Sequence, residues 1–259
     1  MQRIFVNGIE GAGIPADDTS VLLGLTVFET IRTYRGVPFR LDSHLERLTG
    51  SAEQMLIECP DKRTMHDEII FCLEQVPADA PMRVRYTITA DGNRIVDVAP
   101  LDMSRIWAPI SVGRLDWQAP EWLPGVVKHG SRAGWIVAAQ QQNAAEVLLV
   151  DSGGFILEAN RSNVLVVKDG VVLTPPLDTR FLAGVTRSAL LEAAAKAAIP
   201  YEERPLPFDA TYDEFYLSST LKELAPVVSI CGCPAPGEGP IGRRLLDAFR
   251  DLVKEETGG

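Results

Sequence analysis

One segment constrains the fold more than any other part of the sequence. Residues 145–177 read AEVLLVDSGGFILEANRSNVLVVKDGVVLTPPL. AEVLLVD predicts a buried strand, and the rest predicts three more strands, with turns at SGG and KDG. Turns this short join antiparallel neighbours, because a parallel connection needs a crossover of about a dozen residues or more. We therefore expect a mainly antiparallel sheet in the second half of the chain.

The first third of the chain mixes strands and helices. RIFVNG, VFETIRTYRG and VPFRL predict short strands, with a tight turn at Arg35 and Gly36. Apolar residues recur at helical spacing from Ser43 to Ile57, with Ser43 as the expected N-cap. TMHDEIIFCLEQV predicts a second amphipathic helix, and MRVRYTITA alternates as a strand does. These elements indicate an α+β arrangement.

A change of composition divides the chain. Residues 113–125 read GRLDWQAPEWLPG, with two prolines, two tryptophans and no periodicity, which is typical of an interdomain linker. We expect a small N-terminal α/β domain over residues 1–112 and a larger C-terminal domain over residues 126–259. In the larger domain, helices such as GVTRSALLEAAAKAAI pack on the antiparallel sheet. The predicted fold class is α+β or α/β.

Charge and composition argue against several classes of partner. A formal net charge of −10 leaves an acidic surface that would repel a nucleic-acid backbone, so small molecules are the expected partners. The chain lacks an apolar run of about 18 residues and a signal-peptide pattern, so we expect no membrane association and a cytoplasmic location. Cys231 and Cys233 form CGC without further ligands nearby in the sequence, so no metal site is expected.

Five features point to an anion site and a cofactor. Lys128 follows an apolar pair in VVKHGSR, and Glu158 lies among apolar residues, where a carboxylate needs a cationic partner. GVTR places a glycine and a threonine at the start of a helix, where free N–H groups attract phosphate. SST, residues 218–220, offers three hydroxyls, and Arg47 offers a guanidinium. Each feature alone has an ordinary alternative, such as a helix cap or a solvated arginine.

Together these features meet the requirements of pyridoxal 5′-phosphate (PLP). The aldehyde of PLP forms a Schiff base with a lysine, its phosphate needs a cradle, and its ring nitrogen stays protonated only beside an acid. A lysine in an apolar setting, a phosphate cradle and a carboxylate that needs a cation satisfy these three demands. The sequence therefore predicts a PLP enzyme.

The chain resembles the class IV aminotransferases. These fold type IV PLP enzymes include D-amino-acid transaminases, branched-chain aminotransferases and aminodeoxychorismate lyases. The matching blocks follow the family order: FETIRTYRGVPFRLDSHLERL, VKHGSR, EVLLVDSGGFILEANRSNVLVVKDGVVLTPPL, FLAGVTR and YLSSTLKELAPV. The resemblance implies a two-domain fold with the cofactor in the interdomain cleft, and a homodimer.

The resemblance also implies roles for single residues. Lys128 corresponds to the catalytic Schiff-base lysine, Glu158 to the acid on the pyridine nitrogen and Arg47 to the phosphate-binding arginine. Further cofactor-binding residues that it implies are Arg132, Val185, Thr186, Ser219 and Thr220, and Phe28 lines the substrate pocket. Candidates for the substrate carboxylate, each with a solvated or structural alternative, are Arg32, Arg85 and Arg94.

The implied mechanism depends on the protonation of the lysine. A free lysine has a pKa of about 10.4 and is charged at neutral pH, so it cannot attack a carbonyl. An apolar pocket and a neighbouring cation such as Arg132 favour the neutral amine. We hypothesise that Lys128 holds PLP as a Schiff base and then moves a proton between substrate Cα and cofactor C4′, while Glu158 keeps the ring an electron sink.

The sequence leaves the reaction open. Transfer of an amino group between an amino acid, preferably a D-amino acid, and a 2-oxo acid is favoured by SSTLKE. Aminodeoxychorismate lyase activity is favoured by KHGSR, and L-branched-chain transamination is a further alternative. The chain has Gly24, Leu25 and Thr26 where many relatives have Gly-Asp-Gly, so the loop before Phe28 differs. A PLP-binding protein without catalysis is opposed by the presence of both Lys128 and Glu158.

Overall fold

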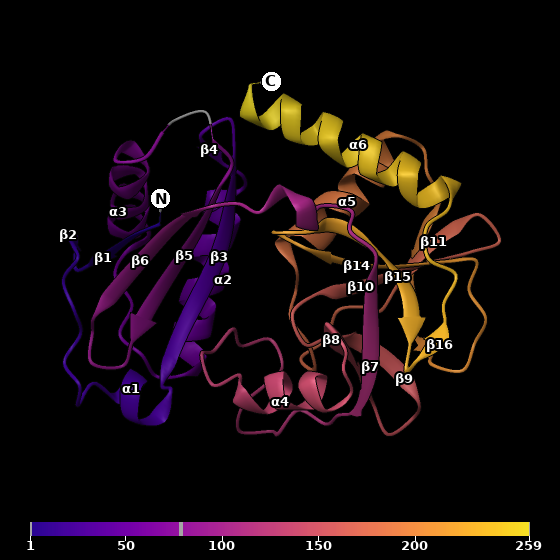
Figure 1. The fold of residues 1–259 in the computed structure, drawn as a ribbon, viewed down its shortest axis with the longest axis horizontal. Helices are drawn as coiled ribbons and strands as arrows, with labels where there is room; N and C mark the ends of the chain where they lie inside the picture. The colour runs from indigo at the N-terminus through magenta and orange to yellow at the C-terminus, as the bar shows by residue number, and fades with distance from the viewer. Residues whose placement is uncertain (1, 78–79, 259) are drawn as a thin grey trace. The chain divides into compact units, whose positions relative to one another are not determined.

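The computed structural model of the protein describes residues 2–77 and 80–258, which form two compact units (Figure 1). Unit 1 comprises residues 2–77, 80–102, 127–132 and 255–258. Unit 2 comprises residues 103–126 and 133–254. Within the described ranges, none of the helices is both long and apolar enough to cross a membrane.

Unit 1 is built on a six-stranded antiparallel sheet with the order β2-β1-β6-β5-β3-β4. Three helices accompany this sheet. The elements are β1 (Arg3–Val6), β2 (Ile9–Glu10), α1 (Thr19–Leu23), β3 (Thr26–Tyr34), β4 (Val37–Pro38), α2 (Leu41–Gln54), α3 (Lys62–Glu74), β5 (Met82–Thr89) and β6 (Arg94–Pro100). The predicted strands and both predicted helices of this region are confirmed.

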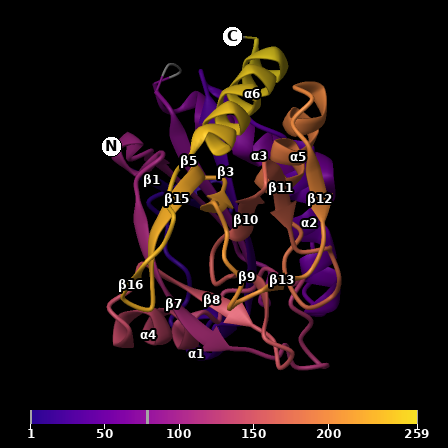
Figure 2. The same ribbon diagram turned by 90° about the vertical axis from the view of Figure 1, so that its right-hand side faces the viewer.

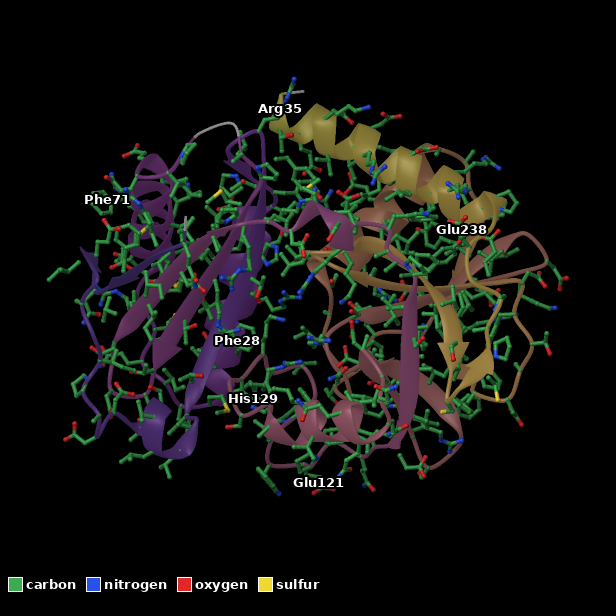
Figure 3. The ribbon with its side chains drawn as sticks, in the orientation of Figure 1. Phe28, Arg35, Phe71, Glu121, His129 and Glu238 are labelled. Carbon is green, nitrogen blue, oxygen red and sulfur yellow. The ribbon has the colours of Figure 1, made fainter. Side chains whose placement is uncertain are left out.

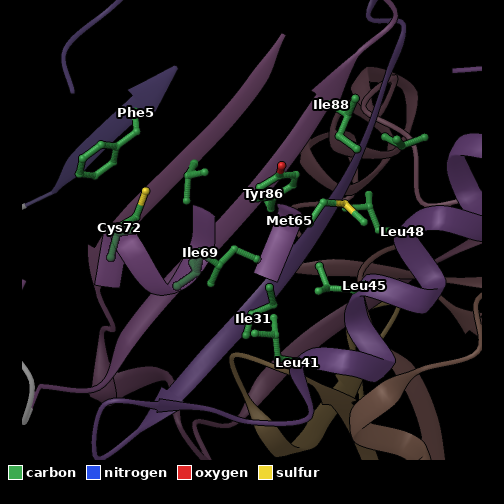
Figure 4. Packing of buried hydrophobic residues seen from close by; sticks show 14 of the residues in the cluster. Phe5, Ile31, Leu41, Leu45, Leu48, Met65, Ile69, Cys72, Tyr86 and Ile88 are labelled. Atoms are coloured by element: carbon green, nitrogen blue, oxygen red, sulfur yellow. The ribbon is translucent and has the colours of Figure 1, made fainter. Parts of the chain in front are cut away.

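The core of unit 1 lies between one face of this sheet and helices α2 and α3 (Figure 4). Ile31 of β3, Leu48 of α2 and Ile69 of α3 are fully buried in it. The prediction that Ser43 is the N-cap of α2 is wrong. The helix begins at Leu41, and Arg40 takes the cap position with a φ of 50°. The cap therefore carries no side-chain oxygen for the first N–H groups.

Unit 2 contains a ten-stranded sheet with the order β12-β11-β10-β14-β15-β7-β8-β9-β13, and β16 pairs with β15. Its elements are a 3-10 turn η1 (Met103–Arg105), β7 (Ile110–Asp116), α4 (Ala133–Gln141), β8 (Glu146–Val150), β9 (Phe155–Ala159), β10 (Asn163–Lys168), β11 (Val171–Thr174), α5 (Val185–Lys196), β12 (Tyr201–Glu203), β13 (Leu206–Pro207), β14 (Glu214–Ser219), β15 (Glu223–Ile230), β16 (Cys233–Pro234) and α6 (Pro240–Thr257), whose last turn belongs to unit 1. Only three pairs among these strands are parallel: β7 with β8, β7 with β15 and β11 with β12. The predicted antiparallel character is confirmed.

The turn between β10 and β11 shows why this part of the sheet is predictable. Asp169 and Gly170 have φ values of 51° and 79°, and they join Lys168 to its cross-strand partner Val171. A two-residue hairpin turn of type I′ requires positive φ at both positions, which Asp-Gly supplies. The helix predicted for GVTRSALLEAAAKAAI is α5, which packs on β12 and β14 (Figure 2).

Two features of unit 2 differ from the sequence analysis. Residues 113–116 belong to β7 and, with the rest of the segment 113–125, to unit 2, whereas we expected a linker there. β7 pairs in parallel with β8 and β15, and such distant partners leave no local pattern in the sequence. Helix α6 is absent from the elements that the sequence analysis predicts.

Candidate cofactor and substrate site

The segment around Lys128 lies along the edge of β3 in unit 1. The Lys128 carbonyl accepts the Phe28 N–H at 3.0 Å, and the Gly130 N–H donates to the Thr26 carbonyl at 2.9 Å. The Lys128 N–H donates to Ser51 Oγ of α2 at 3.1 Å. The backbone of the lysine is therefore held between β3 and α2, which fixes where its side chain begins.

Close contacts make glycine necessary at two points beside this segment. A Cβ atom on Gly130 would collide with the hydroxyl of Thr26. A Cβ atom on Gly24 would meet Ser131 Oγ at 2.9 Å, and Gly24 has a φ of 68°. Ser131 Oγ donates to the Gly24 carbonyl at 3.0 Å. The residues around Thr26 thus pack closely against the KHGSR block.

Three cationic side chains surround the ring of Phe28, which is 4% exposed. The Arg85 guanidinium carbon lies 3.6 Å from the ring centroid, Lys128 Nζ lies 5.0 Å from it and the Arg132 guanidinium carbon 5.8 Å. Cations bind the face of an aromatic ring, but they repel one another. Burial, together with Arg132, lowers the pKa of Arg85 to about 10. An anion placed here would relieve the repulsion.

His129 lies next to Lys128 and is buried against β3. Its backbone forms a bridge with Val27, and Figure 3 labels its side chain together with that of Phe28. Burial, and then the charge of Arg132, lowers the pKa of His129. We therefore expect a neutral imidazole beside Lys128 at neutral pH.

The strand register separates the arginines that were candidates for the substrate carboxylate. Arg85 pairs with Thr30, so it shares a face of the sheet with Phe28 and with Arg32, which lies 4.2 Å over the Tyr34 ring. Arg94 pairs with Ile88, a core residue on the opposite face. There it bonds Glu68 of α3, with Nε 2.8 Å from Oε1. Arg94 therefore does not join the cluster around Phe28.

Arg47 belongs to a buried network that the sequence analysis misses. Its Nε lies 2.7 Å from Glu29 Oε1, and a terminal nitrogen lies 2.8 Å from Oε2. His44 Nδ1 is 2.8 Å from the same Oε2. Burial lowers the pKa of His44, and Lys128 contributes to that shift. Glu29 is a charged residue in the mainly apolar strand segment VFETI. The same pattern predicts a role for Glu158, so it could also have identified Glu29.

Glu158 lies in β9 of unit 2 and is 9% exposed. The Nδ2 of Asn163 donates to its Oε2 at 3.3 Å and to the Leu182 carbonyl at 2.8 Å. Asn163 stands in the LEANRSN block but is not among the predicted site residues. The structure thus connects Glu158, a predicted site residue, to Asn163, for which the sequence predicts no role.

The start of α5 fits an anion. Val185 and Thr186 are its first two residues, both buried, and the N-cap is Gly184. Glycine has no side chain with which to cap the first N–H groups, so these groups are available to a ligand. The twelve residues of α5 add the helix dipole to this end.

The SST segment ends β14 and begins a tight turn. Ser219 is the last strand residue, Thr220 follows, and the Lys222 N–H donates to the Ser219 carbonyl at 3.1 Å. Among the described residues, Ser218 Oγ is one of the few buried polar atoms without a hydrogen-bond partner. A buried hydroxyl of this kind has capacity for a ligand.

A buried ion pair anchors the same turn. Lys222 Nζ lies 2.5 Å from Glu146 Oε1 and donates to Ser162 Oγ at 3.1 Å, and Ser162 Oγ donates to the same Glu146 oxygen at 3.0 Å. Glu146 is fully buried at the start of β8. The ion pair therefore holds the turn with Thr220 against the start of β8.

Comparison with known proteins identifies the family. The sequence model described as "Amino-transferase class IV" matches residues 26–230, most of the chain. The chain belongs to the class IV aminotransferases. They are PLP-dependent enzymes, and the donor groups described above fit that cofactor: an amine, an uncapped helix start and a buried hydroxyl. A group of three or more side chains suited to a metal ion is absent from the described residues.

Relatives of this class IV aminotransferase carry different substrate names. A putative branched-chain-amino-acid aminotransferase of Methanocaldococcus jannaschii is 30% identical over 96% of both chains. A D-alanine aminotransferase of Listeria monocytogenes is 29% identical over 96% of this chain and 94% of its own. The crystal structure of the Escherichia coli branched-chain amino acid aminotransferase matches with a TM-score of 0.87 and 25% identity, covering 98% of this chain and 95% of that one.

Proposed function

We propose that this class IV aminotransferase transfers the amino group of a D-amino acid to a 2-oxo acid. The single observation that carries the proposal is the cluster around Phe28, where the amine of Lys128 and the guanidinium groups of Arg85 and Arg132 all lie near the same ring. An amino acid presents a carboxylate next to the carbon whose proton must move. A guanidinium group can bind the carboxylate, and an amine can move the proton of the neighbouring carbon.

L-branched-chain amino acids are the second candidate donor. The relatives support both donors almost equally, because the D-alanine and putative branched-chain enzymes are 29% and 30% identical to this chain. The SSTLKE block favours D-amino acids. Aminodeoxychorismate, favoured by the KHGSR block, is the third compound for a donor assay.

The proposed cofactor contacts follow the residue roles that the resemblance to class IV aminotransferases implies. Bound PLP supplies an aldehyde that condenses with amines and a ring that accepts electrons from the substrate Cα. Lys128 would hold the aldehyde carbon and Glu158 the ring nitrogen, and Val185 and Thr186 would hold the phosphate through the N–H groups of α5. Arg47, Arg132, Ser219 and Thr220 are the further cofactor-binding residues.

Lys128 also moves the proton in this proposal. Its amine would take the proton from the substrate Cα and return it to C4′ of the cofactor, which requires a neutral amine in a site with little water. The guanidinium groups of Arg85 and Arg132, which lie near the same Phe28 ring, disfavour a further positive charge on the amine. The neighbouring His129, whose pKa burial lowers, adds no positive charge of its own. Arg85 orients the substrate by its carboxylate.

Reduction and peptide mapping test the proposal. The purified protein is incubated with PLP, reduced with borohydride, digested and analysed by mass spectrometry. A pyridoxyl mass on the peptide with Lys128 is expected, and Lys128→Arg removes it. A label on another lysine overturns the assignment. A stereospecific screen with D-alanine, L-leucine and aminodeoxychorismate then identifies the donor, and activity with L-leucine alone overturns the preference for D-amino acids.

Assembly and location complete the proposal. A homodimer is supported by the exposed apolar side chains Val21, Leu22 and Leu23 of α1, because such patches mark contact surfaces. Light scattering during gel filtration tests it, and a monomer at micromolar concentration contradicts it. A cytoplasmic location is supported by the four free cysteines.

A further inference from the structure

Asn163, the first residue of β10, is bonded to three parts of unit 2. Its Nδ2 donates to the Leu182 carbonyl at 2.8 Å and to Glu158 Oε2 at 3.3 Å. Its backbone pairs with Ser218 of β14, in the segment that carries the buried hydroxyl. Asn163 is 6% exposed, so little water competes for these bonds.

Gly184 lies directly against the side chain of Asn163. A Cβ atom on Gly184 would collide with Oδ1 of Asn163. The φ of Gly184 is −73°, which any residue adopts, so the requirement for glycine here comes from space and not from the backbone. Helix α5 begins at the next residue, Val185. The side chain of Asn163 therefore fits against the approach to the helix on one side and against Glu158 on the other.

We infer that Asn163 is a positioning residue that couples the Glu158 carboxylate to the N-terminus of α5. The inference rests on the proposed function, in which Glu158 binds the ring nitrogen of PLP and α5 binds the phosphate. The side-chain amide of Asn163 then fixes the position of the Glu158 carboxylate relative to the N-terminus of α5. Loss of that amide frees both groups to move.

Asn160 offers a matched control. It is buried like Asn163, with 5% exposure, and lies three residues away. Its Oδ1 accepts the Val147 N–H at 3.2 Å, which is a contact with strand β8. Asn160→Ala therefore measures the cost of losing a buried asparagine and its bond to β8, while the bonds of Asn163 to Leu182 and Glu158 are kept.

The first experiment compares the binding of PLP and of pyridoxal, which lacks the phosphate. In Asn163→Ala the Kd for PLP rises by at least about tenfold, the effect of losing a hydrogen bond to a charged group. The preference for PLP over pyridoxal shrinks as well, because the phosphate site is displaced. Asn160→Ala lowers Tm but keeps the preference of the unmodified protein. If Asn163→Ala also keeps that preference, the coupling is absent.

A second variant tests the coupling through the pH midpoint of PLP absorbance, which the loss of a purely structural contact would not shift. Asn163→Asp places a second carboxyl group against Glu158, and two such groups cannot both stay ionised at close range. The absorbance of bound PLP is followed against pH, and its midpoint shifts by about one pH unit or more in Asn163→Asp. A midpoint equal to that of the unmodified protein overturns the inference.

A third test uses the contact between Gly184 and Asn163. Gly184→Ala alone weakens PLP binding, because the new methyl group displaces Asn163. In the Asn163→Ala background the same change has little further effect, because the obstructing oxygen is gone. Fully additive effects would contradict the proposed contact.

Failure of the inference is distinguishable from failure of the proposed function. If borohydride reduction of the unmodified protein with PLP labels no Lys128 peptide, the proposed function fails. If Lys128 is labelled but Asn163→Ala behaves as Asn160→Ala does, only the inference fails.

Discussion

Arg47 and Glu29 form a two-point ion pair, with nitrogen to oxygen distances of 2.7 and 2.8 Å. Glu29 is fully buried, and the Arg47 side chain is 14% exposed. The two parallel bonds fix the plane of the guanidinium, so its other N–H groups point in a set direction. The carboxylate thereby orients the side chain that we propose for phosphate binding.

Glu29→Gln is expected to destabilise the protein strongly. The change leaves Arg47 and the neighbouring His44 without the carboxylate that both contact, at a cost of about 3 kcal/mol. Chemical denaturation measures the free energy of unfolding. Asp67→Asn breaks the exposed pair with Arg63 and serves as the control, with an expected change near zero. Equal effects of the two changes would contradict the importance of burial.

The same carboxylate predicts how stability depends on pH. Burial alone would raise the pKa of Glu29, but Arg47 and His44 outweigh it and hold the pKa well below the ordinary 4.5. A lowered pKa stabilises the folded state above pH 4.5, and this contribution is lost as the pH falls further. Unfolding measured from pH 7 to pH 3 should show the loss. Glu29→Gln should flatten this part of the curve, and a curve parallel to that of the unmodified protein would oppose the assignment.

Arg85 and Arg94 lie on opposite faces of one sheet, which makes them a matched pair for kinetics. Arg85→Gln removes a cation from the Phe28 cluster, so KM for the amino donor should rise by about tenfold or more. Arg94→Gln breaks the bond to Glu68 under the opposite face, so Tm should fall with KM unchanged. Steady-state kinetics and thermal melts separate the two. A larger KM effect for Arg94→Gln would reverse the proposed role.

The pair of Lys222 and Glu146 predicts a compensating double variant. Lys222→Met leaves Glu146 buried and charged, which should cost about 3 kcal/mol. Adding Glu146→Gln removes the unpaired charge, so the double variant should recover much of that stability. Denaturation of both single variants and the double variant measures the coupling. Simple addition of the single effects would exclude a direct interaction.

The four thiols should react in a fixed order. Cys231 and Cys233 are exposed, whereas Cys72 is fully buried and its pKa rises to about 12 through burial and the nearby Glu68. Burial also raises the pKa of Cys59. A chromogenic disulfide reagent should therefore modify two thiols rapidly and the others only in denaturant. Cys231→Ser with Cys233→Ser should abolish the rapid phase, and its persistence would contradict the exposure of these residues.

Local chemistry explains which parts of the fold the sequence predicts. Asp169 and Gly170 have the backbone preferences of a hairpin turn, so the β10–β11 pair is visible in a short window. Strand β7 is not visible in this way, because its pairing partners are distant and Trp117 and Pro120 interrupt any pattern just after it. The N-cap of α2 is missed because Ser43 is a good cap by type, while Arg40 precedes the actual first turn.

The candidate site follows the same division. Lys128 and Glu158 stand out in the sequence because a charged group among apolar residues is unusual, and the other features add the cofactor that connects them. That Arg94 faces away from Phe28 follows only from the register of β5 and β6, which composition does not determine. The role inferred for Asn163 depends on Leu182 and Gly184, about twenty residues further along the chain, and such contacts need the folded structure.

The pairing of Lys128 with β3 bears on how the chain folds during synthesis. The Phe28 N–H donates to the carbonyl of Lys128, which is synthesised 100 residues later. Arg40 likewise forms an ion pair with Glu256, close to the end of the chain. The ribosome adds roughly 5–20 residues each second, so the edge of β3 stays open for several seconds after its strand emerges. An open edge invites pairing with other chains. The lysine segment therefore also closes a strand edge that is open to aggregation while the chain is being synthesised.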